Sequence, residues 1–364
     1  MTLFGSRHDV DALVDITRAF VGERLALARE AAGLDIKDVA ERVGTTSSAI
    51  SQLEHRTTKP KTETLLRLAF ALGVPPAFFA TAPPPDLPVE RCHFRRLRSA
   101  PAREQRQVRA RGRLVREIVG YLEEVFEFPA DAVRPLQRRV ATLPDIEALA
   151  QAVRDAWGLG LAPLGNVVGL LEAKGVIPVE VHGHSERLDA FSVWVDDRAM
   201  VFLSIDKGSA SRRRFDAAHE LGHLAMHWDL EAGDATLERE ADQFAAAFLM
   251  PRDAFLAECP VRLSWPALRA MKVRWGTSLL ALVRRAHDCE RYSDATYRRA
   301  HVQYAQQGWR RGEPDEPPME HPRLVADAVA QLEAAGQPAT ATAAALRHGP
   351  RLFEDLVWPR GRAA

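Results

Sequence analysis

Hydrophobic residues recur at helical spacing through the N-terminal part of the chain. Three glycines, Gly33, Gly44 and Gly73, separate successive apolar stretches. This pattern predicts a bundle of five short helices within residues 1–80. The Pro-rich sequence TAPPPDLP then interrupts the pattern, so we expect residues 81–135 to form a linker followed by an arginine-rich helix.

Further along the chain, three stretches have the pattern of β-strands. VIPVEVHG, AFSVWVDD and AMVFLSID alternate between apolar and polar residues or run continuously apolar. Asp196 and Asp197 lie between the second and third stretches, where a hairpin turn is expected. These stretches predict one small sheet.

Two long helical patterns follow these strands. They cover residues 209–227 and 234–249, and Pro251 stops the second. We assign residues 136–258 to one domain that contains the sheet and these helices, and residues 259–364 to a helical C-terminal region. The expected fold class is therefore α+β, predominantly α.

The composition excludes several classes of protein. The chain has 49 Lys and Arg residues against 49 Asp and Glu residues, so any nucleic-acid surface must be local. Its three cysteines, Cys92, Cys259 and Cys289, lack CxxC spacing, which argues against a disulfide framework and suits a reducing compartment. The N-terminus mixes acids into its apolar residues, and no apolar run approaches the ~20 residues that span a bilayer. We expect a cytoplasmic protein without membrane association.

An arginine-rich stretch follows the Pro-rich sequence. Its members are Arg91, Arg95, Arg96, Arg98, Arg103, Arg106, Arg109, Arg111, Arg113 and Arg116. One hypothesis is that these side chains contact phosphates, including those of single-stranded DNA. The other is that they form a solvated helix face or pair with acids elsewhere in the chain.

The sequence HELGH predicts a metal site. His219 and His223 lie four residues apart, so both imidazoles project from one helix face and can share a Zn²⁺ ion. Glu220 can act as general base toward the attacking water. On the next helix, Glu238 is the natural third ligand, and Asp242 can accept an N–H bond from a ligand histidine. A chance HExxH would not explain this second pair.

Other histidines lie near the motif. His227 follows it by one helical turn and either faces a cleft, where it could help a substrate carbonyl, or is a helix-end histidine favoured by the helix dipole. His182 and His184 lack a third partner at suitable spacing, and we interpret them as loop residues.

RRRFDAAHELGHLAMH followed by EREADQFAAAFLMP resembles the ImmA/IrrE family of zinc metallopeptidases over residues 145–255. The resemblance implies zinc-dependent peptide hydrolysis, with His219, His223 and Glu238 as ligands and Glu220 as catalytic base. In this family, stand-alone peptidases cleave a separate helix-turn-helix repressor.

A second constellation predicts DNA recognition. Asp35 and Thr46 are plausible N-caps of two short helices joined by a turn at Gly44. The second helix and its cap present small polar side chains that can approach base edges and phosphates, namely Thr46, Ser47, Ser48, Ser51 and Gln52. Arg56 and Lys59 flank this helix as phosphate contacts. An ordinary helical bundle with a polar face is the alternative.

This segment resembles the XRE family of Cro/lambda-repressor-like helix-turn-helix domains over most of residues 17–80, through GERLALAREAAGL, VAERVGTTSSAISQLE and LLRLAFALGVPPAFF. Ile36 and His55 depart from the family pattern, where a polar residue and a glycine are common. The resemblance implies binding of a double-stranded DNA operator, and we expect a homodimer that matches two half-sites.

Together these motifs predict a DNA-binding regulator fused to a zinc endopeptidase that cleaves itself or a partner repressor in a stress or mobile-element response. TAPPPDLP is an exposed candidate for self-cleavage. One alternative is a transcription factor whose peptidase-like domain is only a sensor or dimerisation module. Another is a toxin–antitoxin or phage-related component whose helix-turn-helix binds protein.

Overall fold

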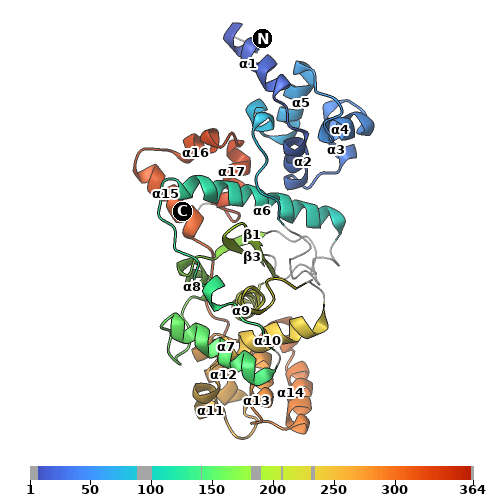
Figure 1. Cartoon of the computed structure of the whole chain (residues 1–364). Helices are drawn as coiled ribbons and strands as arrows, with labels where there is room; N and C mark the ends of the chain where they lie inside the picture. The colour runs from blue at the N-terminus through green and yellow to red at the C-terminus, as the bar shows by residue number, and fades with distance from the viewer. Residues whose placement is uncertain are drawn as a thin grey trace. The chain divides into compact units, whose positions relative to one another are not determined.

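The computed structural model describes residues 7–87, 101–140, 142–181, 190–205, 208–230 and 234–361, with side chains from residue 13 onward. Helices predominate, and the described residues contain a single three-stranded sheet (Figure 1). The expected α+β class, predominantly α, is therefore confirmed. Among the described helices, none has the length and apolar character needed to cross a membrane.

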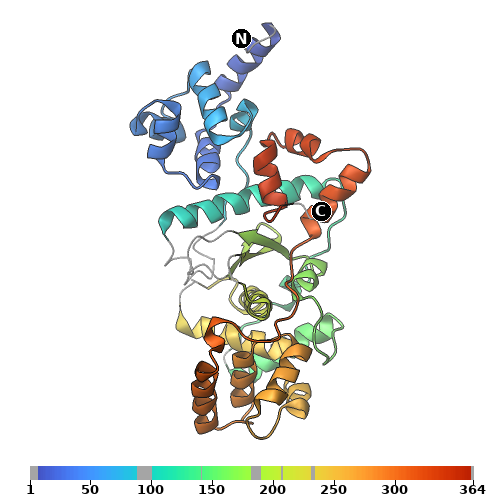
Figure 2. The same cartoon turned by 180° about the vertical axis from the view of Figure 1, so that it is seen from behind.

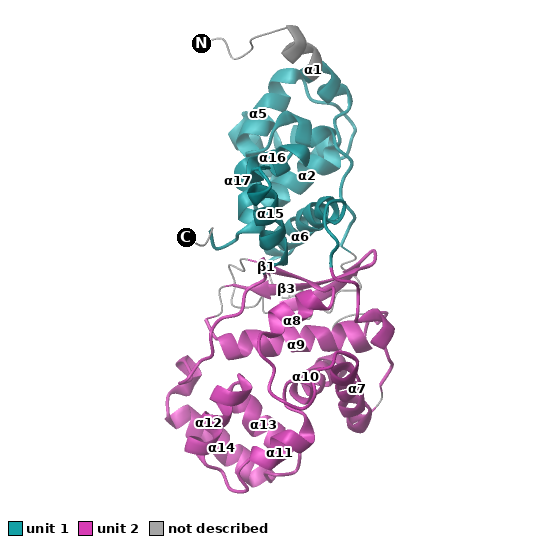
Figure 3. Cartoon of the chain, turned by 90° about the vertical axis from the view of Figure 1, so that its left-hand side faces the viewer, with its two compact units in different colours: residues 1–87, 98–128, 323–364 teal, residues 88–97, 129–322 magenta. Residues whose placement is uncertain are grey.

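The chain divides into two compact units, each built from segments that are far apart in sequence (Figure 3). Unit 1 comprises Met1–Leu87, Arg98–Phe128 and Arg323–Ala364, and unit 2 comprises Pro88–Leu97 and Pro129–Pro322. Part of the segment predicted at 259–364 therefore lies in each unit.

Unit 1 begins with a bundle of short helices. These are α1 (Arg7–Arg18), α2 (Gly22–Ala31), α3 (Ile36–Val43), α4 (Ser47–Glu54), α5 (Thr62–Leu72) and the 3-10 helix η1 (Pro76–Ala80). Asp35 caps α3 in a capping box in which the Asp38 carboxylate accepts the Asp35 N–H at 2.8 Å. Thr46 caps α4 by accepting the Ala49 N–H at 3.1 Å. Both predicted N-caps are confirmed.

Gly22 begins α2 where this helix touches the last turn of α4. A Cβ atom at this position would lie 2.2 Å from the carbonyl oxygen of Leu53 and 2.4 Å from that of Glu54. Because backbone atoms cannot rotate out of the way, we expect Gly22→Ala to force the two helices apart. The free energy of unfolding should fall by about 1–3 kcal/mol, measured by urea denaturation.

Gly120 supplies the matched control. It also lies in a helix of unit 1, α6 (Ala102–Glu123), but a Cβ there would meet only the flexible Arg116 side chain, at 3.4 Å. Gly120→Ala should raise stability by up to about 1 kcal/mol through helix propensity. Equal stability of the Gly22→Ala protein and the wild type would contradict the predicted clash.

The C-terminal helices complete the core of unit 1. They are α15 (Leu324–Ala334), α16 (Ala339–Ala345) and α17 (Pro350–Val357), and Figure 2 shows them beside α6. The Glu117 carboxylate of α6 accepts hydrogen bonds from Arg24 at 3.0 Å and from His348 Nε2 at 2.8 Å. The side chains of Arg24 and His348 are fully buried. A buried ionic cluster thus joins α2, α6 and the turn before α17.

Unit 2 contains the sheet. Its strands are β1 (Ile177–Val181), β2 (Ala190–Val195) and β3 (Arg198–Ser204), in the order β1-β3-β2. β1 is parallel to β3, and β2 is antiparallel to β3. Asp196 has a positive φ of 55° in the turn between β2 and β3, which confirms the predicted hairpin.

Helices cover the sheet and extend the core of unit 2. They are α7 (Leu143–Ala156), α8 (Val167–Ala173), α9 (Ala210–Met226), α10 (Ala235–Leu249), α11 (Arg252–Glu258), α12 (Trp265–Trp275), α13 (Leu279–Asp288), α14 (Asp294–Gln306) and the 3-10 helices η4 (Arg134–Leu136) and η5 (Trp309–Arg311). Helix α9 contacts β2 and β3 on one side and α10 on the other (Figure 1). Gly222 permits this close approach, because a Cβ there would lie only 3.0 Å from the Phe244 ring.

An acidic segment, residues 313–320, neutralises buried cations of unit 2. Glu313 and Glu316 both pair with Lys272 of α12, whose side chain is fully buried, and the Lys272–Glu313 distance is 2.6 Å. Glu320 pairs with the buried Arg214 of α9. The acidic segment therefore stabilises the positions of α9 and α12 through buried ion pairs.

Candidate metal centre and DNA-contact surface

Helices α9 and α10 bring three ligand atoms together. The Nε2 atoms of His219 and His223 lie 3.0 Å apart. The Glu238 carboxylate lies 3.8 Å from His219 Nε2 and 3.7 Å from His223 Nε2. A tetrahedral zinc ion with bonds of ~2.0–2.1 Å needs ligand atoms about 3.3 Å apart. The three residues therefore fit a zinc ion, and Nε2 of each histidine is the atom presented to it.

Glu220 lies beside these ligands with an unsatisfied carboxylate oxygen. The residue is 2% exposed, and its Oε2 atom has no hydrogen-bond partner among the described residues. Burial raises the pKa of Glu220 to about 8, although the nearby His219 opposes the rise. A buried carboxyl group that titrates near neutral pH is suited to accept and return a proton.

A carboxylate orients the first ligand histidine. His219 Nδ1 lies 2.8 Å from Asp242 Oδ1, as expected for an N–H bond that leaves Nε2 available to a cation. Burial alone would lower the pKa of His219, but Asp242, Glu220 and Glu238 together raise it to about 9. The carboxylates around His219 therefore stabilise positive charge at this place, which a cation bound at Nε2 would supply instead of a proton.

The second ligand histidine has an imidazole as its neighbour. His223 Nδ1 lies 3.0 Å from His227 Nδ1, and His227 Nε2 lies 2.9 Å from Glu240 Oε2. His227 is only 1% exposed, so the structure places it against protein groups and not in an open cleft. Burial lowers the pKa of His227 to about 4, with the neighbouring His219 adding to the effect.

Glu240 is the residue of this centre that the sequence did not reveal. It lies between Glu238 and Asp242 in EREAD, where a third acid has the pattern of a solvated helix face. Only the packing of α10 against α9 brings it to His227. The earlier histidines considered as ligands, His182 and His184, lie outside the described residues.

The predicted DNA-contact residues lie on α4 or flank it in the sequence. Its N-terminal end and outer face are exposed at Thr46, Ser47, Ser48 and Gln52, and Ser51 is partly buried. Arg56 and Lys59 are also exposed but have partners within the protein. Arg56 lies 3.7 Å from the Glu23 carboxylate, and Lys59 Nζ donates to the carbonyl oxygen of Arg18.

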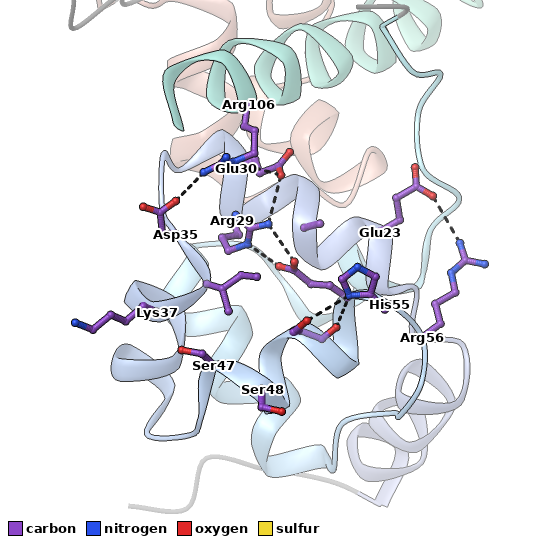
Figure 4. A pocket seen from close by; sticks show the side chains of 14 residues that line it. Glu23, Arg29, Glu30, Asp35, Lys37, Ser47, Ser48, His55, Arg56 and Arg106 are labelled. Carbon is purple, nitrogen blue, oxygen red and sulfur yellow. Dashed lines mark hydrogen bonds and ion pairs between the residues drawn. The ribbon is translucent and has the colours of Figure 1, made fainter. Parts of the chain in front are cut away.

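A groove of about 1100 Å³ runs along α4, and its lining extends from Ser47 to Arg56 (Figure 4). Its lining includes four acids and four cations, namely Glu23, Glu30, Asp35, Glu54, Arg29, Lys37, Arg56 and Arg106. Several of them pair with each other, as Arg29 does with Glu54 at 2.6 Å. The formal charges cancel, so the groove itself contributes little long-range attraction for phosphates.

Each described arginine of the stretch at 91–116 has an acidic or carbonyl partner. Arg103 pairs with Asp38, Arg106 with Asp35, Arg109 with Asp86, Arg113 with Glu23 and Arg116 with Glu123, and Arg111 donates to the Asp355 carbonyl oxygen. For these arginines the structure favours pairing with acids over a path for single-stranded DNA. Arg91, Arg95, Arg96 and Arg98 lie outside the described residues.

Comparison with protein families identifies both modules. Residues 21–80 match a family described as helix-turn-helix domain, which places a DNA-binding module in unit 1. Residues 177–287 match the IrrE N-terminal-like domain of the peptidase M78 family. The chain therefore combines an XRE-type helix-turn-helix domain with an ImmA/IrrE-type metallopeptidase-like domain, as the resemblance predicted. No curated protein gives a significant match to the chain.

Proposed function

We propose that this chain is a transcriptional regulator that binds double-stranded DNA and carries a zinc-dependent endopeptidase. The observation that carries the proposal is the convergence of His219, His223 and Glu238 beside the buried Glu220 carboxylate, in a chain with a helix-turn-helix domain. The substrate is a regulatory protein, either this chain or a partner repressor. Cleavage would occur in the cytoplasm in response to stress or to a mobile element.

The residues of the centre divide the chemistry between them. His219, His223 and Glu238 would hold the zinc ion, which when bound would polarise the scissile carbonyl and acidify the attacking water. Glu220 takes the proton from that water and returns it to the leaving amine. Its burial excludes bulk water from this proton transfer.

The Pro-rich sequence bears on the choice of substrate. Pro84 and Leu87 are buried, and the Arg113 guanidinium donates to the carbonyl oxygens of Pro84 at 2.7 Å and Pro85 at 3.2 Å. A peptidase needs an extended and accessible segment, so this contact with α6 argues against cleavage within residues 81–87. We therefore favour a partner repressor over self-cleavage in this segment.

Incubation of the zinc-loaded protein, with and without DNA from upstream of its own gene, distinguishes the two substrates. Fragments that form from the wild type but not from Glu220→Gln would demonstrate self-cleavage. A stable full-length band in both proteins directs the search to partner repressors encoded beside this gene.

DNA binding is tested by adding negative charge to α4. Ser47 and Ser48 are exposed at its first turn, where phosphates and base edges would approach. We expect the double variant Ser47→Glu/Ser48→Glu to weaken binding to DNA upstream of the gene by about 10–100-fold. Footprinting measures this, and a dimer should protect two half-sites about 34–36 Å apart.

The control places the same two charges elsewhere in unit 1. Thr340 and Ala344 are exposed on α16. Thr340→Glu/Ala344→Glu should bind as the wild type does. Equal binding by both double variants would contradict the assignment of α4 as the DNA-contacting helix.

A further inference from the structure

The Nδ1 atom of each ligand histidine is linked to a carboxylate by hydrogen-bond contacts, directly for one histidine and through a second imidazole for the other. His219 reaches Asp242 directly, through a contact of 2.8 Å between Nδ1 and Oδ1. His223 reaches Glu240 only through His227, by contacts of 3.0 Å and 2.9 Å. The second route is the more buried, because the side chains of His223 and His227 are 1% and 2% exposed.

The positions of the protons along this second route follow from the ligand atom. If His223 Nε2 binds a cation, the proton of that imidazole is on Nδ1, which must then donate to His227 Nδ1. His227 Nδ1 accepts, so the proton of the neutral His227 ring is on Nε2. That N–H donates to the Glu240 carboxylate. All contacts along the route are satisfied by one arrangement of protons, with both histidines neutral.

We propose that His227 and Glu240 are positioning residues for the metal centre, which fix the tautomer and ring orientation of His223 and make its Nε2 a better ligand. The inference rests on the proposed zinc site and deepens it. A hydrogen bond from a ligand imidazole to a basic partner raises the electron density at the coordinating nitrogen and removes alternative ring orientations. The Glu240 carboxylate polarises the His227 imidazole, which makes His227 Nδ1 a better acceptor for the His223 N–H.

A purely structural role makes a different prediction. If His227 served only to fill space at the end of α9, an apolar residue of similar volume would preserve the centre. If it positions His223, the centre needs a hydrogen-bond acceptor at the place of His227 Nδ1. A His227→Asn variant would place its side-chain oxygen near the position of His227 Nδ1 but would not reach Glu240. This variant therefore separates the contact with His223 from the contact with Glu240.

The test is the zinc affinity of the full-length protein, measured by competition with a chromophoric chelator. We expect His227→Leu to weaken zinc binding by about 10–100-fold and Glu240→Gln by about tenfold. His227→Asn should fall between the wild type and His227→Leu, because it restores only the first hydrogen bond. Circular dichroism checks that the metal-free variants are folded, and Glu240→Gln and His227→Asn carry the test if His227→Leu does not fold.

The matched control is His348→Leu, which removes another buried histidine–glutamate contact, to Glu117 in unit 1. Its zinc affinity should equal that of the wild type. Equal zinc affinity of the wild type, His227→Leu and Glu240→Gln, combined with loss of zinc in His219→Ala, would overturn the positioning role and leave the proposed function intact. A wild-type protein that binds no zinc would overturn both.

Discussion

Zinc-loaded Glu220→Gln protein is expected to keep its metal and to hydrolyse peptides about 10²–10⁴-fold more slowly than the wild type. Glutamine preserves the size of the side chain but cannot take a proton from the attacking water. The three ligand atoms come from other residues, so zinc content should be unchanged. Release of new amino termini from a fluorescent peptide mixture measures the rate, and metal analysis measures the zinc.

Two further variants serve as controls for the Glu220→Gln experiment. Glu238→Gln should lose both zinc and activity, because it removes a ligand. Glu258→Gln makes the same carboxylate-to-amide change in α11, where the side chain pairs with Arg274, and should retain both. Cleavage by Glu220→Gln at the wild-type rate would contradict the assignment of Glu220 as the base.

Replacing Glu320 by alanine is expected to lower the free energy of unfolding by about 3–5 kcal/mol. The Glu320 carboxylate pairs with Arg214, whose side chain is 5% exposed. It also accepts the N–H groups of Val167 at 2.8 Å and Val168 at 3.1 Å. Its loss would leave a buried guanidinium without its counter-charge and two amide groups without an acceptor.

Asp315→Asn in the same segment is the control for this experiment, because asparagine tolerates the positive φ of 58° at this position. Asp315 pairs with Arg269, and both side chains are partly exposed, at 32% and 47%. The loss of this pair should therefore shift the urea midpoint much less than the loss of Glu320 does. If urea denaturation gave the same midpoint for Glu320→Ala and Asp315→Asn, Glu320 would not hold α9 in place as we describe.

The features that could be predicted from the sequence are those that depend on residues close together in the chain. The i, i+4 relation of His219 and His223 places both on one face of α9, and Glu238 and Asp242 are similarly one turn apart on α10. The N-caps of α3 and α4 and the turn at Asp196 also depend on neighbouring residues, and the structure contains each of them.

The sequence could not predict the pairs that form between distant segments. Glu240 is thirteen residues beyond its partner His227, and His348 is 231 residues beyond Glu117. The same limit applies to the arginine-rich stretch, since its described cations meet acids such as Asp35 that only the packing of α6 against α2 brings near. Composition shows that charges are present but not which of them neutralise each other.

Anomalous scattering at the zinc edge, from crystals of the full-length protein grown with zinc, tests the central claim most directly. We predict one strong peak at ~2.0–2.2 Å from His219 Nε2, His223 Nε2 and a carboxylate oxygen of Glu238. The absence of a peak among these three side chains, or a zinc ion held by other residues of the chain, would contradict the proposed centre.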